Sequence, residues 1–237
     1  MSRITKKNKA FSLAETIAIF IVLGVIAATA LPSLMKTNFR RTSITRVKKM
    51  YLTLQSALDS MIIFNNYENI NFRNYPPTSE GANKVYEDFI KPYIKVSYVA
   101  GTDKTKKANI MDCDKPMKLL SGSYHTSDYC NSNKYFGVKL NDGSTILMRG
   151  YNEDDLYFSF DMNGAKGPNT LGKDIFRFYL NPDKKTDYIY PSKEENLRSC
   201  ISSGNGGWEC AEWVIVKGNM DYLDCPGNYN WTKNKCN

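Results

Sequence analysis

The chain has 237 residues, of which 42% are hydrophobic and 24% are charged, and its formal net charge is +8. Four basic residues lie among the first ten, and the remainder carries 28 basic against 24 acidic residues, a charge of +4. This weak basicity does not support nucleic-acid binding. The length suits one ordinary domain with an appended segment. Only residues 16–35 form an uncharged apolar stretch long enough to cross a bilayer.

The N-terminus combines a short basic segment with this apolar run, and one acid, Glu15, stands just before the run. The segment is consistent with an uncleaved signal anchor. It is also consistent with a secretory signal peptide, whose A-x-A site at 28–30 would release a soluble protein starting at Leu31. Both interpretations leave the carboxylate at the membrane boundary without a role.

A third interpretation comes from the stretch KNKA-FSLAETIAIFIVLGVIAATALPSL. A small residue, Ala10, precedes Phe11, Glu15 is the fifth residue counted from Phe11, and Gly24 and Pro32 follow. This order resembles the N-terminal motif of type IV pilins and type II secretion pseudopilins, although the leader of that family usually ends in glycine. The resemblance implies that a prepilin peptidase cuts between Ala10 and Phe11 and N-methylates Phe11. It also implies a helix that loosens or kinks at Gly24 and Pro32.

The resemblance implies a structural subunit of a type IV pilus or of a type II secretion-like pseudopilus. An ionised carboxylate inside a bilayer costs on the order of 2.5–3.5 kcal/mol, so Glu15 needs a partner. In a filament, the new amine of a neighbouring subunit's Phe11 would pair with it. The implied partners are the prepilin peptidase, other pilin subunits in a homo- or hetero-polymer, and the bacterial inner membrane.

The implied location is the inner membrane, as a single-pass protein with its C-terminal head outside the cytosol. The protein would then pass into a pilus or pseudopilus, in the periplasm or at the cell surface. The alternative function is a secreted or membrane-anchored soluble binding module, delivered by an ordinary signal peptide or anchor.

The apolar pattern continues beyond the membrane-length run. Hydrophobic residues recur at spacings of three and four, which predicts an amphipathic helix packed on a globular head. They are Ile44, Val47, Tyr51, Leu54, Leu58, Met61 and Ile62. Because Pro32 lacks an amide hydrogen and crowds the preceding turn, we expect a kink or local melting there. The predicted domains are the leader 1–10, the transmembrane or filament-core helix 11–35, its amphipathic continuation 36–65 and a disulfide-bonded, β-rich head 66–237.

Strand patterns dominate the head. Asn141-Asp142-Gly143 predicts a hairpin between the two β-rich runs of residues 135–150. Alternation and aromatic content predict further strands at 156–162, 175–180, 187–191 and 212–218. Residues 84–94 predict a short helix that Pro92 ends, after a loop at 74–83. The predicted fold class is α+β, with a long N-terminal helix, membrane-spanning in its first half, packed on a C-terminal antiparallel sheet. The family resemblance implies the same architecture.

Six cysteines lie between residues 113 and 236, all beyond the apolar run. An even number in an exported chain indicates disulfides and an oxidising compartment. Zinc is the competing interpretation, but there is no C-x-x-C pair and only one histidine. Proximity in sequence favours the pairs Cys113–Cys130, Cys200–Cys210 and Cys225–Cys236, with Cys210–Cys225 as the competitor of the last.

Residues 161–174, DMNGAKGPNTLGKD, place Asp161, Asn163, Asn169 and Asp174 among three glycines between two predicted strands. Oxygen ligands at alternating positions with a turn glycine suit a hard cation such as calcium. The loop is not an EF-hand, because no glutamate stands at its twelfth position. The resemblance adds that several pseudopilins carry calcium in such loops. The alternative is a tight turn whose Asn, Gly and Pro residues serve its geometry.

One cluster invites an enzymatic interpretation. Ser121, Ser123, His125 and Asp128 lie within eight residues, whereas catalytic triads are assembled from distant segments. The sequence has no P-loop, Rossmann or zinc signature. It therefore predicts a protein that is not an enzyme.

Overall fold

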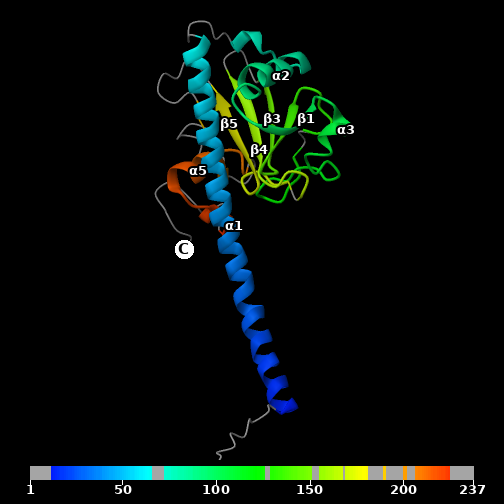
Figure 1. The fold of residues 1–237 in the computed structure, drawn as a ribbon, viewed down its shortest axis with the longest axis vertical. Coiled ribbons are helices and arrows are strands. Elements are labelled where there is room, and N and C mark those ends of the chain that lie inside the picture. Colours follow the sequence, from blue (N-terminus) through cyan, green and yellow to red (C-terminus); the bar gives the residue numbers. More distant parts are fainter. Residues whose placement is uncertain are drawn as a thin grey trace, which may run out of the picture. The chain divides into compact units, whose positions relative to one another are not determined.

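The computed structural model describes residues 12–65, 72–125, 129–150, 155–167, 169–180, 189–190, 200–201 and 206–224. The chain divides into two units, residues 1–42 and residues 43–237. The helices, shown in Figure 1, are α1 (Leu13–Asn65), α2 (Ser79–Val85), α3 (Lys104–Lys107) and α5 (Cys210–Lys217), with shorter turns η2 (Phe72–Asn74), η3 (Tyr86–Ile90) and η5 (Asp221–Leu223). The strands are β1 (Val96–Gly101), β2 (Phe136–Leu140), β3 (Thr145–Gly150), β4 (Leu156–Asp161), β5 (Ile175–Leu180) and β6 (Ile189–Tyr190).

The six strands form one antiparallel sheet in which each strand pairs with the next in sequence. The predicted hairpin joins β2 to β3, with Lys139 opposite Thr145. Its turn holds Gly143 at φ 85°, a left-handed conformation that glycine adopts without strain. Only two residues of the strand predicted at 187–191 are described, as β6. The predicted α+β class is confirmed.

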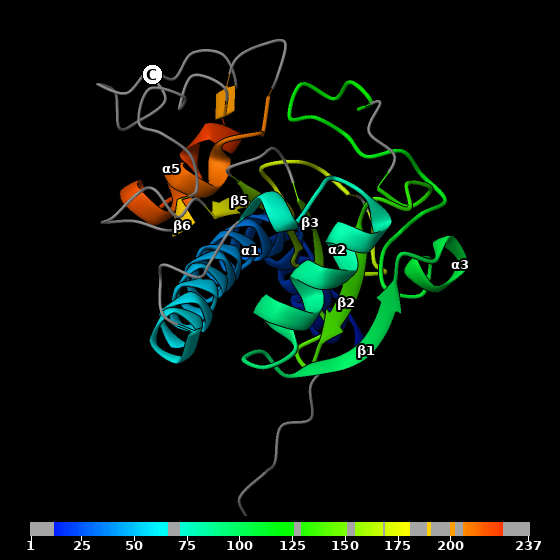
Figure 2. The same cartoon turned by 90° about the horizontal axis from the view of Figure 1, so that it is seen from above.

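The part of α1 that belongs to the second unit packs on this sheet. The predicted stripe is confirmed, because its members are buried or partly buried in one core with the sheet. Its buried members are Val47, Leu54, Leu58 and Met61, and Met50 and Ala57 of α1, which the stripe did not include, are buried as well. Figure 2 shows α2 beside this part of the helix, over β2 and β3. Burial of each large apolar side chain contributes about 1.5–3 kcal/mol.

Alternation along the strands divides the head into two cores. In β4, Phe158 and Phe160 join the core that α1 covers, while Tyr157 lies in a second core with Leu147 and Ile175. Successive side chains of a strand point to opposite faces, and every residue of β4 is buried. The sheet is therefore covered on both faces at this strand.

The strand predicted at 212–218 is wrong, because these residues form most of helix α5. Valine and isoleucine favour strands, and this preference misled the prediction. Gly218 ends the helix in a left-handed conformation, and its N–H donates to the carbonyl of Val214. That arrangement is a common helix terminus. Ala211 and Trp213 are buried on the packed side, so tertiary contacts outweigh local strand preference.

The loop predicted at 74–83 is wrong in its second half, where α2 begins at Ser79. Thr78 caps this helix by accepting a hydrogen bond from the N–H of Gly81 (3.2 Å). The helical path continues through η3 to Ile90 and ends before Pro92, as predicted. Strand β1 was not predicted from the sequence; it lies at the sheet edge and pairs with β2 through two irregular steps.

Candidate functional site

The start of α1 holds the acid that the sequence singles out. The N–H of Ser12 donates to Glu15 Oε2 (2.8 Å), and the N–H of Glu15 donates to Ser12 Oγ (3.2 Å). This reciprocal pair is a capping box, which satisfies two N–H groups at a helix start. Sequence reasoning missed it, although the S-x-x-E spacing is its signature. Ala10 and Phe11, the predicted cleavage site, lie outside the described residues.

The first unit exposes its apolar side chains. Phe20 is 67% exposed and Leu23 is 54% exposed, and the same holds along the whole run. Among the described residues, α1 is the one helix long and apolar enough to cross a membrane, by length and composition alone. This is compatible with single-pass anchoring. The helix continues through Gly24 and Pro32, so it is not broken there, and the kink stays a prediction.

The four residues of the predicted cation site lie in or beside the β4–β5 loop (residues 161–174). Asp161 is the last residue of β4 and pairs with Ile175, the first residue of β5. The N–H of Met162 donates to the carbonyl of Asp174 (2.9 Å), and Arg46 of α1 donates to the carbonyl of Met162 (2.7 Å). Two strands and a helix therefore fix both ends of the loop.

Each acid of the loop already accepts hydrogen bonds from it. Asp161 Oδ1 accepts from the N–H groups of Asn163 and Gly164, both at 3.0 Å. Asp174 Oδ2 accepts from Asn163 Nδ2 (3.2 Å), and its other oxygen accepts from the N–H of Thr170. Gly164 adopts a left-handed φ of 58°. The loop thus folds around its two carboxylates.

Three oxygens of this group are buried and have no hydrogen-bond partner: Asp161 Oδ2, Asn163 Oδ1 and Asn169 Oδ1. The amide nitrogen of Asn169 donates to the carbonyl of Asp112 (2.9 Å). A buried oxygen without a donor costs free energy, and a bound cation is one way to satisfy such oxygens. Carboxylate and amide oxygens are the ligands that calcium prefers, so the residues fit this ion.

The two carboxyls are also unusually buried, with Asp161 only 1% exposed and Asp174 only 4% exposed. Burial raises the pKa of Asp161 well above its usual value, and the nearby charges of Asp174 and Asp112 raise it further. Burial likewise raises the pKa of Asp174 to about 6. Within the described part of the chain, no three acidic, histidine or cysteine side chains are grouped closely enough to hold a metal. A cation would therefore need the two amide oxygens as well.

Two disulfides flank this loop. Cys113–Cys130 and Cys200–Cys210 are both present, with Cα–Cα distances of 5.7 and 4.7 Å, which are ordinary values. A side chain at Gly172 of the loop would meet Cys210 Sγ at 2.7 Å. Cys225 and Cys236 lie outside the described residues, so their pairing stays a prediction.

The cluster around His125 has an ordinary structural setting. The ring of His125 packs edge-on against Trp208, with 4.4 Å between the ring centroids. The backbone N–H of His125 donates to the carbonyl of Met117 (2.8 Å). Asp128 lies outside the described residues. The prediction that this chain is not an enzyme stays a prediction.

Fold and site together define an α+β protein with one candidate membrane-spanning helix and a disulfide-bonded head that contains a buried acid–amide loop. No protein-family model, curated protein or solved structure matches this chain.

Proposed function

We propose that this chain is a structural subunit of a type IV pilus or a type II secretion-like pseudopilus, assembled through the first half of α1. The observation that carries the proposal is the exposed apolar surface of residues 13–35, in which Glu15 is the single charged residue. Such a surface needs lipid or other protein to cover it, and the carboxylate needs a positive charge nearby. The leader, Phe11 and Pro32 add support through the family resemblance.

In this proposal a prepilin peptidase removes residues 1–10 and methylates Phe11. The subunit waits in the inner membrane with its head outside the cytosol and then joins other pilin subunits. Glu15 pairs with the amine of a neighbour's Phe11, and this pairing sets the register between subunits. Removing one member of a buried ion pair typically costs about 3–5 kcal/mol.

The mature N-terminus tests this proposal. Mass spectrometry of the exported protein should find a chain that begins with methylated Phe11. A chain that begins at Leu31 would show an ordinary signal peptide, and an intact residue 1 would show an uncleaved anchor. Either result would replace the filament subunit with a secreted or anchored binding module.

We also propose that the β4–β5 loop of the head binds calcium. The three buried oxygens without donors support this, together with two buried carboxyls whose pKa values are raised. The alternative, a loop built only for its turn geometry, leaves those oxygens without a partner. Calcium would hold Asp161, Asn163, Asn169 and Asp174 together and so stabilise the connection between β4 and β5, two inner strands of the sheet.

Thermal unfolding of the full-length protein in detergent tests calcium binding. A ligand at 100 times its Kd stabilises by about 2.7 kcal/mol, so adding calcium after chelation should raise the Tm by several degrees. Asp161→Asn should abolish the shift. Asp59→Asn is the matched control, because it makes the same charge change at an exposed position of α1. Equal Tm values with calcium and with chelator would refute the site.

A further inference from the structure

A segment remote in sequence, residues 110–118, runs along the β4–β5 loop. The amide of Asn169 donates to the carbonyl of Asp112, as described above. Lys118 exchanges backbone hydrogen bonds with the loop, accepting from Leu171 (2.9 Å) and donating to Asn169 (2.8 Å). The loop is therefore held by this segment along its second half, in addition to the strands at its ends.

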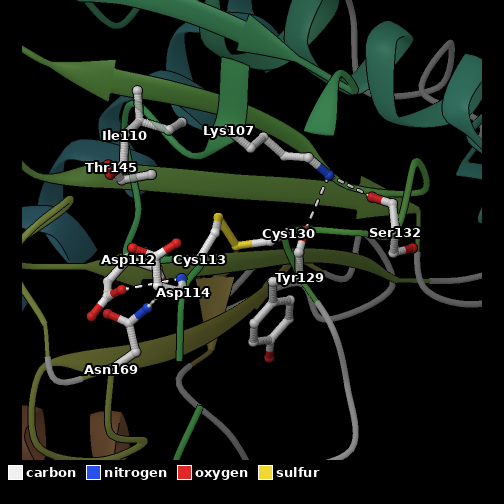
Figure 3. Close-up of a disulfide and its surroundings, with 10 residues drawn as sticks. All are labelled: Lys107, Ile110, Asp112, Cys113, Asp114, Tyr129, Cys130, Ser132, Thr145 and Asn169. Atoms are coloured by element: carbon white, nitrogen blue, oxygen red, sulfur yellow. Dashed lines mark hydrogen bonds between the residues drawn. A yellow bond between two sulfur atoms is a disulfide. The ribbon is translucent and has the colours of Figure 1, made fainter. Parts of the chain in front are cut away.

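Within this segment, the carboxylate of Asp112 faces the loop. A Cβ atom at Gly167 would lie 2.1 Å from Asp112 Oδ2, so only glycine allows the carboxylate to come so close to the loop backbone. Figure 3 shows the side chains of Asp112 and Asn169 lying together. Asn169 presents a buried oxygen without a donor, and the charge of Asp112 acts on Asp161. A carboxylate from one part of the chain and an amide oxygen from another thus lie side by side.

The position of Asp112 is set by its neighbour in sequence. Cys113 forms the disulfide with Cys130, as Figure 3 shows. On the far side of that bridge, buried Lys107 donates from Nζ to the carbonyls of Tyr129 (3.1 Å) and Ser132. The segment that carries Cys130 is therefore fixed to α3, and through the disulfide it fixes Asp112.

Water has access to Asp112 and Asn169. A cavity of about 310 Å³ is lined by Asp112, Cys113, Cys130 and Asn169, among others. Its volume is large enough for several water molecules. Of the four proposed ligands only Asn169 lines this cavity, so a cation bound at Asn169 Oδ1 would be contacted by Asp112 through a bound water.

We propose that Asp112 is an outer-shell residue of the calcium site, which binds a calcium-bound water, and that the Cys113–Cys130 disulfide holds it in place. This inference rests on the calcium site proposed above. Outer-shell partners of metal sites typically change affinity by about 10–100-fold. Because coupling between two events is reciprocal, calcium should also protect this disulfide from reduction.

Calcium titration calorimetry of the full-length protein in detergent tests the role of Asp112. Asp112→Asn should weaken calcium binding about tenfold, Asp161→Asn should abolish it, and Asp59→Asn, at an exposed position of α1, should leave it within twofold. Circular dichroism of the calcium-free variants establishes that the fold is kept. If Asp161→Asn abolishes binding while Asp112→Asn binds like the unaltered chain, the inference fails and the site stands. If the unaltered chain binds no calcium, both fail.

The role of the disulfide is tested in the same measurement. The double variant Cys113→Ala/Cys130→Ala should bind about tenfold more weakly, and adding Asp112→Asn to it should cost less than a further twofold. A full tenfold additional loss would show that the disulfide does not position the carboxylate. A second readout needs no cysteine variant: in dithiothreitol redox buffers at equilibrium, calcium should raise severalfold the ratio of reduced to oxidised dithiothreitol that half-reduces Cys113–Cys130 in the unaltered chain but not in Asp112→Asn. Equal midpoints with and without calcium would overturn the coupling.

Discussion

The two halves of α1 belong to one helix, but apolar side chains are exposed in the first half and buried in the second. Leu23, in the first unit, is 54% exposed, whereas Leu54, in the second unit, is 3% exposed. The first half repeats apolar residues on every face, and the second half confines them to a stripe. The second half thus finds its apolar contacts within its own chain, and the first half must find them in lipid or in other chains. Substitutions in the first half should therefore impair filament assembly, whereas substitutions in the core around the second half should lower the stability of the head.

The largest effect is expected in the first half, at Glu15. Glu15→Gln removes the charge but keeps an acceptor for the capping box, since glutamine serves there as well as glutamate. Filament incorporation should fall by more than 100-fold, because about 3–5 kcal/mol is lost at each subunit contact. Leader cleavage should continue. Sheared filaments and membrane fractions, probed with an antibody against the head, measure both.

Ser12→Ala is the matched control for this prediction, because it removes the hydroxyl of the capping box and leaves the charge of Glu15. Assembly should then remain within a few-fold of normal. If Ser12→Ala blocks assembly while Glu15→Gln permits it, the acid acts as a helix cap and the proposed charge pairing is wrong.

The next effect tests the second half and its core. Phe158→Ala removes a ring that is 2% exposed and should lower the free energy of unfolding by about 3–5 kcal/mol. Leu23→Ala, in the exposed run, should leave the unfolding of the head unchanged. Urea unfolding of the full-length protein in detergent, followed by tryptophan fluorescence, compares the two. Equal destabilisation would mean that the first half also packs within its own chain.

The buried stripe of α1 and the β2–β3 hairpin were both predicted from local sequence patterns. The spacing of Val47, Leu54 and Leu58 predicted which side of the helix is buried, and Asn141-Asp142-Gly143 predicted the hairpin, because both depend on neighbours in sequence. Helix α5 was missed because its packing against the head outweighs the strand preference of its β-branched residues. Strand β1 was not predicted because its apolar and polar residues do not alternate regularly.

Each of the two units also contains an acid in an unusual setting, Glu15 in the first and Asp174 in the second. In the second unit this should make stability depend on pH. The pKa of Asp174 is raised to about 6 because the carboxyl is buried, so the folded state binds its proton more tightly than the unfolded state does. Stability from this group is fully present below about pH 4, the unfolded pKa, and is lost as pH rises through 6. The calcium-free protein should lose up to about 3 kcal/mol over this window.

Urea unfolding at several pH values, with chelator and with calcium, measures this dependence. Calcium should remove most of the loss above pH 6, because it compensates the ionised carboxylates. Asp174→Asn should reduce the loss that the calcium-free protein shows as pH rises through 6, while the raised pKa of Asp161 still contributes to the profile. A calcium-free profile that rises between pH 4 and 6 would contradict the assigned direction of the pKa shift.

Three of the four loop residues named from the sequence, Asp161, Asn163 and Asp174, are joined by hydrogen bonds, because they lie within fourteen positions between adjacent strands, whereas Asn169 bonds to the carbonyl of Asp112. Asp112 could not be found in this way. It is 49 positions before Asp161, and only the path of residues 110–118 beside the loop brings it close. The capping box at Ser12 and Glu15 was predictable from the S-x-x-E spacing, whereas the family resemblance concerns only the charge of Glu15.

The smallest expected effect is on the free energy of unfolding, at two glycines of the head. Both have a left-handed backbone, but their surroundings differ. Gly172 has φ 74°, and a Cβ there would meet Cys210 Sγ at 2.7 Å and Gly207 Cα at 2.9 Å, whereas Gly143 has φ 85° with nothing within 4 Å. Gly143→Ala should cost about 1 kcal/mol from backbone strain alone. Gly172→Ala should cost about 2–3 kcal/mol, because the disulfide and the backbone of residue 207 must also move. Urea unfolding gives both values, and equal losses would mean that the β4–β5 loop and the Cys200–Cys210 disulfide are not packed closely enough to restrict each other.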